Sequence, residues 1–196
     1  LLDGLKLIHY LKLKKIGLQM AQDKFIDLIA GISYIQDADQ LEKYSTDSSG
    51  YEAALPYIVV RPVTTDEVVR VVKACSACNL GYTIQGGLTG LAGGARPDEG
   101  DVVISLELMN KIEEIDTIGG TAVVQAGVVL EDIQNVVQEH GWYFPLDLGA
   151  RGSCQIGGNI STNAGGNKVF RYGTTRELVL GLEVVLPDGT VLNMLN

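Results

Sequence analysis

The sequence lacks any run of about 18 apolar residues, the length that a helix needs to cross a membrane. Its three cysteines in 196 residues are too few for a disulfide framework. Positive charge is also scarce, because 15 Lys and Arg stand against 24 Asp and Glu and give a formal net charge of −9. We therefore expect no transmembrane segment and no nucleic-acid partner. Apolar residues make up 46% of the chain, which is typical of a globular protein.

Two of the cysteines, Cys75 and Cys78, form a Cys-x-x-Cys pair. A redox pair would follow a strand, and a zinc site would need a second Cys or His pair, but neither accompanies these residues. We interpret them as two small residues at the end of a helix, and we predict no metal site.

The first 19 residues differ from the rest in charge, with four lysines and a single acidic residue, Asp3. They contain no arginine, no serine and no small-residue cleavage site, which argues against a transit peptide. We interpret residues 1–19 as a leader or extension of unknown role. Residues 20–196 are expected to form the folded domain.

The first half of that domain alternates between strand and helix patterns. An apolar run at residues 57–60 is followed by a helix that Thr64 begins, with Glu67 as its capping-box partner, and that ends at residues 79–81. The next strand covers residues 82–85. This strand–helix–strand unit predicts parallel strands joined by a right-handed crossover.

The second half is dominated by paired strands, so we predict the α+β class. We divide the domain into one subdomain at about residues 52–106 and another at about 107–196. The other predicted elements are a short helix at 23–29, a strand at 101–106, a hairpin of 111–116 and 121–126, a helix at 129–140, and strands at 181–186 and 190–192.

The strand at 82–85 leads into a stretch with five glycines among residues 85–94. Glycine tolerates positive φ and has no Cβ, so successive N–H groups of such a loop can point to one centre and hold a phosphate. The alternative is a flexible surface turn. A P-loop is excluded because the required Lys is missing, and a Rossmann site is excluded because another strand, not a helix, follows the glycines.

A second glycine-rich region, residues 149–166, combines glycine with short hydroxyl and amide side chains. Such a segment can approach a flat polar ligand closely and offer it hydrogen bonds. The alternative is an irregular Ω-loop stabilised by its own polar groups. Two such regions fit an extended dinucleotide better than a single phosphate.

The motif Gln-Gly-Gly-Leu-Thr-Gly-Leu-Ala-Gly-Gly at residues 85–94 resembles the pyrophosphate loop of FAD-binding domains of the vanillyl-alcohol oxidase type (PCMH-type). The segments at 145–166, 171–173 and 181–189 are similar to the D-2-hydroxyglutarate dehydrogenase and D-lactate dehydrogenase group. The resemblance covers residues 57–194 and implies a two-subdomain fold that binds FAD. The cofactor-binding residues that it implies are Gly86, Gly87, Leu88, Thr89, Gly90, Leu91, Gly93, Gly94, Pro145, Asp147, Ser153, Gly157, Gly158, Asn159, Thr162, Asn163 and Val184.

Several positions depart from the family pattern. Leu88 stands where relatives often carry Asn or a flavin-linking His, so the resemblance implies noncovalent FAD. Gln155 replaces a common His and Leu108 a frequent Arg, which leaves the substrate open. Arg171 is either a contact for a substrate carboxylate or a member of a structural ion pair.

Catalytic residues are not evident, because the only histidines are His9, in the extension, and His140, at a predicted helix end. In the family, a substrate-binding cap follows this domain, and we expect that cap to be absent here. The resemblance implies the FAD-binding portion of an enzyme that oxidises a D-2-hydroxy acid by hydride transfer to flavin N5. The alternatives are a glycolate oxidase subunit or other FAD-linked oxidase, or a non-catalytic nucleotide-binding module.

The expected partners are a small 2-hydroxy acid, an electron acceptor that is a protein or a quinone, and a second copy of the chain in a homodimer. We expect a cytoplasmic protein, with the mitochondrial matrix or a peripheral membrane position as the alternative.

Overall fold

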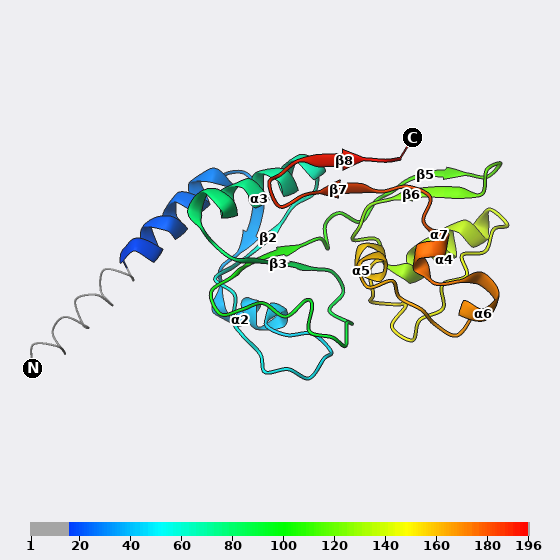
Figure 1. Cartoon of the computed structure of the whole chain (residues 1–196), viewed down its shortest axis with the longest axis horizontal. Coiled ribbons are helices and arrows are strands. Elements are labelled where there is room, and N and C mark those ends of the chain that lie inside the picture. The colour runs from blue at the N-terminus through cyan, green and yellow to red at the C-terminus, as the bar shows by residue number, and fades with distance from the viewer. Residues whose placement is uncertain (1–15, 196) are drawn as a thin grey trace, which may run out of the picture.

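The computed structural model describes residues 16–195 (Figure 1). Most of the predicted extension, residues 1–15 with His9, therefore lies outside the described residues. Residues 16–28 are helical, so the helix predicted for 23–29 begins earlier than expected. The α+β class is confirmed, with helices and both parallel and antiparallel strand pairs.

A four-stranded sheet forms the first part of the molecule, in the order β1 (Ser33–Ile35), β2 (Ile58–Arg61), β4 (Val102–Ser105), β3 (Tyr82–Gln85). Strands β2 and β3 both pair with β4 in parallel, whereas β1 pairs with β2 in antiparallel orientation. The parallel strands of the predicted strand–helix–strand unit are confirmed. Because β4 lies between β2 and β3, the connecting helix spans two strand positions.

That connection is α3 (Thr65–Cys78), and its ends follow the sequence signals closely. The Thr64 hydroxyl accepts a hydrogen bond from the Glu67 N–H at 3.2 Å, as an N-cap should. The Glu67 carboxylate accepts from the Val63 N–H at 2.7 Å instead of from Thr64, so the expected capping box is displaced by one residue. Asn79 ends the helix in the left-handed conformation, with φ of 51°.

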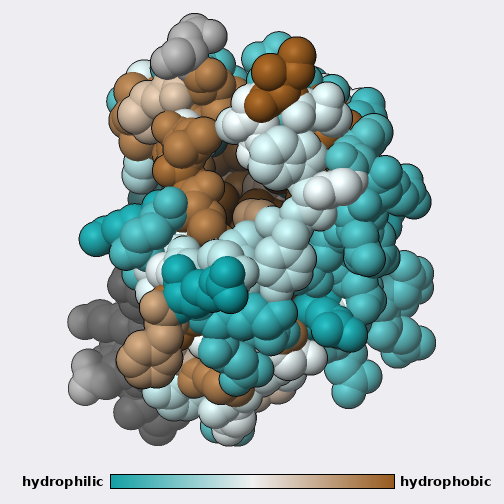
Figure 2. Space-filling model, turned by 90° about the vertical axis from the view of Figure 1, so that its right-hand side faces the viewer, coloured by the Kyte–Doolittle hydropathy of each residue, from teal (hydrophilic) through white to brown (hydrophobic). Residues whose placement is uncertain are grey.

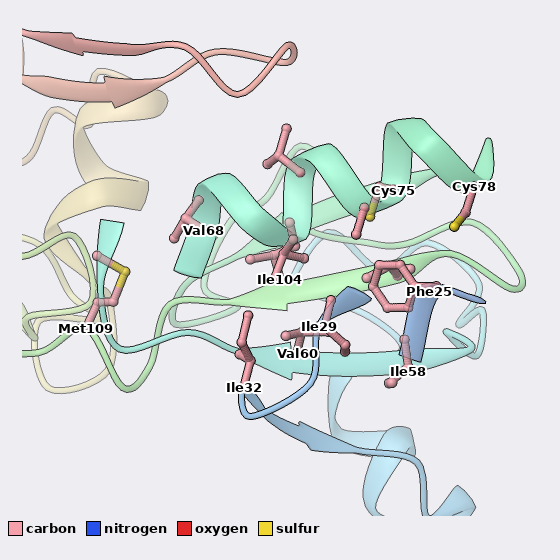
Figure 3. Packing of buried hydrophobic residues seen from close by; sticks show 14 residues of the cluster. Phe25, Ile29, Ile32, Ile58, Val60, Val68, Cys75, Cys78, Ile104 and Met109 are labelled. Carbon is pink, nitrogen blue, oxygen red and sulfur yellow. The ribbon is translucent and has the colours of Figure 1, made fainter. Parts of the chain in front are cut away.

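The first hydrophobic core fills the space between α3, the sheet and the first helix (Figure 3). Phe25 comes from the first helix and Ile29 directly follows it, whereas Ile58 and Ile104 come from the central strands. The side chains of Cys75 and Cys78 belong to this core, in agreement with their interpretation as helix residues. Burial raises the pKa of the Cys75 thiol to about 12.

The second part of the molecule begins with the hairpin β5 (Ile112–Asp116) and β6 (Thr121–Val124), followed by α4 (Leu130–Glu139). All three elements were predicted. Three short helices in and after the second glycine-rich region were not predicted, nor were β1, α2 (Ala38–Leu41) and the 3₁₀ turn Glu42–Tyr44. The three short helices are α5 (Ile156–Ser161), α6 (Val169–Tyr172) and α7 (Thr175–Leu178).

A second core lies under α4, with Leu130 and Ile133 packed against residues that follow α4 in the sequence, such as Leu146 and Ile156. The last hairpin, β7 (Glu183–Val185) and β8 (Val191–Asn193), extends back over α3 (Figure 1). There the Thr65 hydroxyl donates to the Glu183 carboxylate at 2.5 Å, and Val185 packs against the first core. The hairpin therefore links the two parts of the molecule, and the subdomain boundary near residue 106 stays a prediction.

Apolar residues gather around a hollow on the face formed by the end of the second part (Figure 2). Ile118, Phe170 and Leu180 are the most exposed large apolar side chains of that part. None of the helices within residues 16–195 is long and apolar enough to cross a membrane.

Candidate cofactor-binding site

The structure brings the two glycine-rich regions into direct contact. A Cβ atom added to Gly87 would overlap the carbonyl oxygen of Ser153, and one added to Gly86 would lie 3.2 Å from Oε1 of Gln155. The backbones approach this closely because both loop residues lack side chains. The glycine at 87 is thus required by the protein itself and not only by a ligand, as the sequence had suggested.

The glycine loop, residues 86–94, presents a series of free backbone donors. Within residues 16–195, none of its N–H groups donates a hydrogen bond to a protein acceptor, and the first N–H afterwards that does so is that of Ala95. Leu88 adopts φ of 58°, a left-handed conformation that a leucine rarely takes and that costs free energy. A left-handed residue among successive free N–H groups is the kind of backbone from which anion-binding concavities are built.

The two ends of the loop are tied together by Gln85, whose side chain is completely buried. Its Nε2 donates to the carbonyl of Ala95 at 2.7 Å and to that of Tyr44 at 2.8 Å. Its Oε1 has no hydrogen-bond partner among the described residues. Gln85 was not among the predicted site residues, and its burial at the end of β3 is a property of the tertiary structure.

Gln155, in the second region, resembles Gln85 in being a buried amide whose oxygen has no partner among the described residues. The Cys154 carbonyl accepts from the Leu130 N–H at 3.0 Å, and the Ile156 N–H donates to the Val128 carbonyl at 2.9 Å, so residues 154–156 run beside residues 128–130. Gln155 is 8% exposed, and its Oε1 also lacks a partner in the described part of the chain. A buried polar atom without a partner costs free energy, which a ligand or water can offset.

The polar side chains predicted to contact a cofactor mostly bond to the chain itself. The Ser153 hydroxyl donates to the Ala150 carbonyl, and the Thr162 hydroxyl donates to the Gly158 carbonyl. The Asn159 amide is buried and donates to Cys154 Sγ, and Asn163 Oδ1 accepts from the Arg176 N–H. These side chains therefore shape the second region through hydrogen bonds within the chain.

Several predicted glycines leave open space next to the backbone. A Cβ added to Gly94 or Gly158 would meet no atom within 4 Å, and one added to Gly90 would meet only Asp47, at 3.9 Å. By contrast, Gly93 packs against Tyr51 and Gly157 packs against Ala126. The open positions mark where a ligand can approach the backbone. Thr89 and the exposed Leu91 lie in the same loop.

The remaining predicted residues are spread more widely. Pro145 and Asp147 precede the second glycine-rich region, where the Asp147 carboxylate lies 3.9 Å from Lys168 Nζ. Gly166 packs against the Asp147 backbone. Val184 lies in β7.

Charge is distributed unevenly around the site. Residues 148–176 contain no Asp or Glu, although the chain is acidic overall. Their basic residues are Arg151, Lys168, Arg171 and Arg176. Arg171 forms no ion pair within residues 16–195 and instead lies over the Tyr172 ring, 5.2 Å from its centre. This leaves Arg171 free for an external anion. His140 is the exposed C-cap residue of α4.

A group of three His, Cys, Asp or Glu side chains that could hold a metal ion does not occur in the described part of the chain. The site that the structure does form consists of free N–H groups, open glycines and two buried amides.

A protein family described as FAD binding domain matches residues 56–195. The chain belongs to this family. D-2-hydroxyglutarate dehydrogenase of Bos taurus, a mitochondrial protein, is 47% identical over 161 residues, which cover 82% of this chain and 30% of the relative. A mitochondrial protein of Schizosaccharomyces pombe, provisionally named a D-lactate dehydrogenase, is 41% identical over 168 residues, or 86% of this chain and 32% of the relative.

Solved structures agree with this assignment at the level of the fold. A structure of alkyldihydroxyacetonephosphate synthase is similar with a TM-score of 0.80 and 20% identity, covering 88% of this chain and 35% of that one. The resemblance to FAD-binding domains of the vanillyl-alcohol oxidase type, and to the D-2-hydroxyglutarate and D-lactate dehydrogenase group, is confirmed. The chain spans about 30% of the length of the curated relatives that it matches.

The FAD-binding assignment fits the residues present. A dinucleotide has a pyrophosphate that only accepts hydrogen bonds, and the N–H groups of the loop at 86–94 have no protein acceptor within residues 16–195. It also has sugar-like hydroxyls, which both donate and accept and can satisfy a buried amide such as that of Gln155.

We predict that Gly87→Ala lowers the free energy of unfolding by about 1–3 kcal/mol, because its Cβ would overlap the Ser153 carbonyl and force the two regions apart. Chemical denaturation of the FAD-free protein measures this change. Gly94→Ala, in the same loop but facing open space, is the matched control and should leave stability unchanged. Equal stability of both variants would contradict the close contact between the two regions.

Proposed function

We propose that the chain binds FAD noncovalently and is the FAD-binding portion of an enzyme that oxidises a D-2-hydroxy acid. The observation that carries the proposal is the series of free N–H groups at residues 86–94, held against a second glycine-rich region. Leu88 supports noncovalent binding, because its side chain has no nucleophilic atom with which to form a bond to the flavin.

The residues of this chain have separate tasks in that proposal. The loop at 86–94 binds the pyrophosphate through its amides, and Gln155 binds a hydroxyl of the chain that joins pyrophosphate and flavin. The acid-free segment at 148–176 offsets the negative charge that the ligand brings. FAD, when bound, supplies the group that accepts a hydride from the substrate.

The choice of substrate rests on the relatives, which are named as D-2-hydroxyglutarate or D-lactate dehydrogenases. Both substrates are D-2-hydroxy acids and carry a carboxylate, and Arg171 is free to attract one. Because the relatives are about three times longer, activity, substrate and electron acceptor are proposals for the whole enzyme. The mitochondrial names of the relatives favour the mitochondrial matrix over the cytoplasm.

We expect the purified protein to bind FAD and show a flavin absorption spectrum, and we expect Gly158→Ala to weaken FAD binding by about tenfold or more. The added methyl group enters open space in the FAD-free protein, but it would lie against the ligand. Calorimetric titration with FAD measures the affinity.

Gly17→Ala is the matched control, because Gly17 also lies in a helix with no atom within 4 Å of an added Cβ. Both variants should keep or slightly raise the free energy of unfolding, by up to about 1 kcal/mol. Wild-type protein that stays colourless and gives no heat with FAD would refute the proposal and favour a different nucleotide or no ligand.

Gln155→Met should have opposite effects on stability and on binding. Removing a buried amide oxygen without a partner should raise the free energy of unfolding of the FAD-free protein by about 1 kcal/mol. The same change removes a ligand contact and should weaken FAD binding about fivefold to tenfold. Gln138→Met, at an exposed position of α4, should alter neither quantity. Unchanged FAD affinity in Gln155→Met would show that this amide does not contact the cofactor.

In the full enzyme, D-2-hydroxyglutarate or D-lactate should bleach the flavin absorbance under anaerobic conditions, whereas the L enantiomers should not. The bleaching reports hydride transfer to the bound flavin independently of the natural electron acceptor. A full enzyme that retains FAD but is bleached by neither D-hydroxy acid would exclude this substrate class and leave the FAD site intact.

A further inference from the structure

Residues 44–52, which we name the brace, lie along the glycine loop although they are far from it in sequence. They precede the region that matches the family, residues 56–195. Three hydrogen bonds show that the brace lies along the loop. The Tyr44 carbonyl accepts from Gln85 at the start of the loop, and Ser48 donates to Leu88 within it. At the loop exit, Arg96 donates to the Glu52 carbonyl at the end of the brace.

The Leu88 carbonyl accepts two hydrogen bonds from Ser48, one from its N–H and one from its hydroxyl, both at 3.1 Å. A trans peptide is planar, so its C=O and N–H point in opposite directions. Fixing the Leu88 carbonyl toward the brace therefore turns the N–H of Thr89 away from the brace. Ser48 sets the direction of one of the free donors of the loop and holds Leu88 in its left-handed conformation.

The Asp47 carboxylate joins the end of the loop to the brace, because each of its two oxygens accepts one hydrogen bond. One accepts from the Ala95 N–H at 3.3 Å, and the other accepts from the Ser49 N–H at 3.0 Å. Burial raises the pKa of Asp47, but these hydrogen bonds outweigh it and hold the pKa below its ordinary value. The carboxylate is therefore ionised at neutral pH, and it occupies the N–H that directly follows the free series.

The last part of the brace packs on the loop exit. The Tyr51 ring lies against Gly93, where a Cβ would come 2.6 Å from the ring, and Gly93 has φ of 76°. Arg96 Nε donates to the Glu52 carbonyl at 2.5 Å. The brace thus contacts the beginning, the turn and the end of the loop while leaving its N–H groups free.

We propose that the brace, through Ser48 and Asp47, is a positioning element that holds the glycine loop in its FAD-binding conformation. The proposal rests on the proposed function of the site. Ser48 and Asp47 bond to the loop backbone, and their donors and acceptors are used within the protein. They act by raising the fraction of molecules whose loop is already arranged for the ligand.

The test compares Ser48→Ala, Ser48→Thr and Asp47→Ala with the wild type in stopped-flow measurements of FAD binding. Ser48→Ala removes one hydrogen bond to the Leu88 carbonyl, and Asp47→Ala removes the acceptor of the Ala95 N–H at the loop exit, so we expect the association rate constant to fall about threefold to tenfold in each. The dissociation rate constant should stay unchanged, because no contact with the cofactor is lost. Ser48→Thr keeps the hydroxyl and should restore wild-type association. Ser76→Ala, at an exposed serine of α3, is the control.

Three results would overturn the proposal: unchanged association, a faster dissociation that indicates direct contact, or a loss that Ser48→Thr does not restore. NMR order parameters of the amides at 86–94 in the FAD-free protein give a second readout. They should fall in Ser48→Ala and Asp47→Ala but not in Ser48→Thr or Ser76→Ala. A wild type that binds no FAD would refute both the proposed function and the predicted effect on the association rate constant. The order parameters would still show whether the brace orders the loop.

Discussion

The close approach of Gly86 and Gly87 to the backbone of residues 153–155 is the contact on which the site depends. A side chain at position 87 would overlap a carbonyl oxygen, so the two regions meet only because that Cβ is missing. The first region reaches the contact because it directly follows strand β3. The second region is held there by the hydrogen bonds of residues 154–156 with residues 128–130. Neither region forms the site alone. Strand β3, which leads into the first region, packs on the first core through Tyr82, whereas Cys154 and Ile156 of the second region belong to the second core.

The chain has a net charge of −9, which repels an anionic ligand such as a pyrophosphate. Backbone N–H dipoles do not alter the net charge, so a glycine loop can attract a pyrophosphate inside an acidic protein. The acid-free segment at 148–176 reduces the repulsion locally. The ionised Asp47 lies beside the loop, but its oxygens are satisfied by two N–H groups, one of them from the loop exit. Backbone N–H groups therefore have two tasks. The one at the exit, of Ala95, binds this carboxylate, and those along the loop at 86–94 are free for a ligand.

The agreement between sequence and structure varies with how local each signal is. Helix α3 follows from Thr64, a repeated apolar face and Asn79, all within 16 residues, and the hairpin β5–β6 follows from alternation around a glycine turn. The glycine loop was recognised for the same reason. The helices α5 to α7 were missed for two reasons. Helix α5 contains two glycines, which have little helix propensity, and α6 and α7 are only four residues long, too short to show a helical apolar pattern. Asn159 illustrates the limit, since its type suggested a ligand contact, yet its amide bonds to Cys154.

The sequence by itself determined the class of the fold, the two glycine-rich regions and, through its motifs, the FAD-binding family. These depend on short stretches whose residue types restrict the backbone directly. Only the tertiary structure decided that Gly87 lies against Ser153, that Gln85 and Gln155 are buried with oxygens that have no partner among the described residues, and that residues 44–52 contact the loop. These features depend on residues about 10 to 70 positions apart, and no local pattern encodes which distant backbone group a residue will meet.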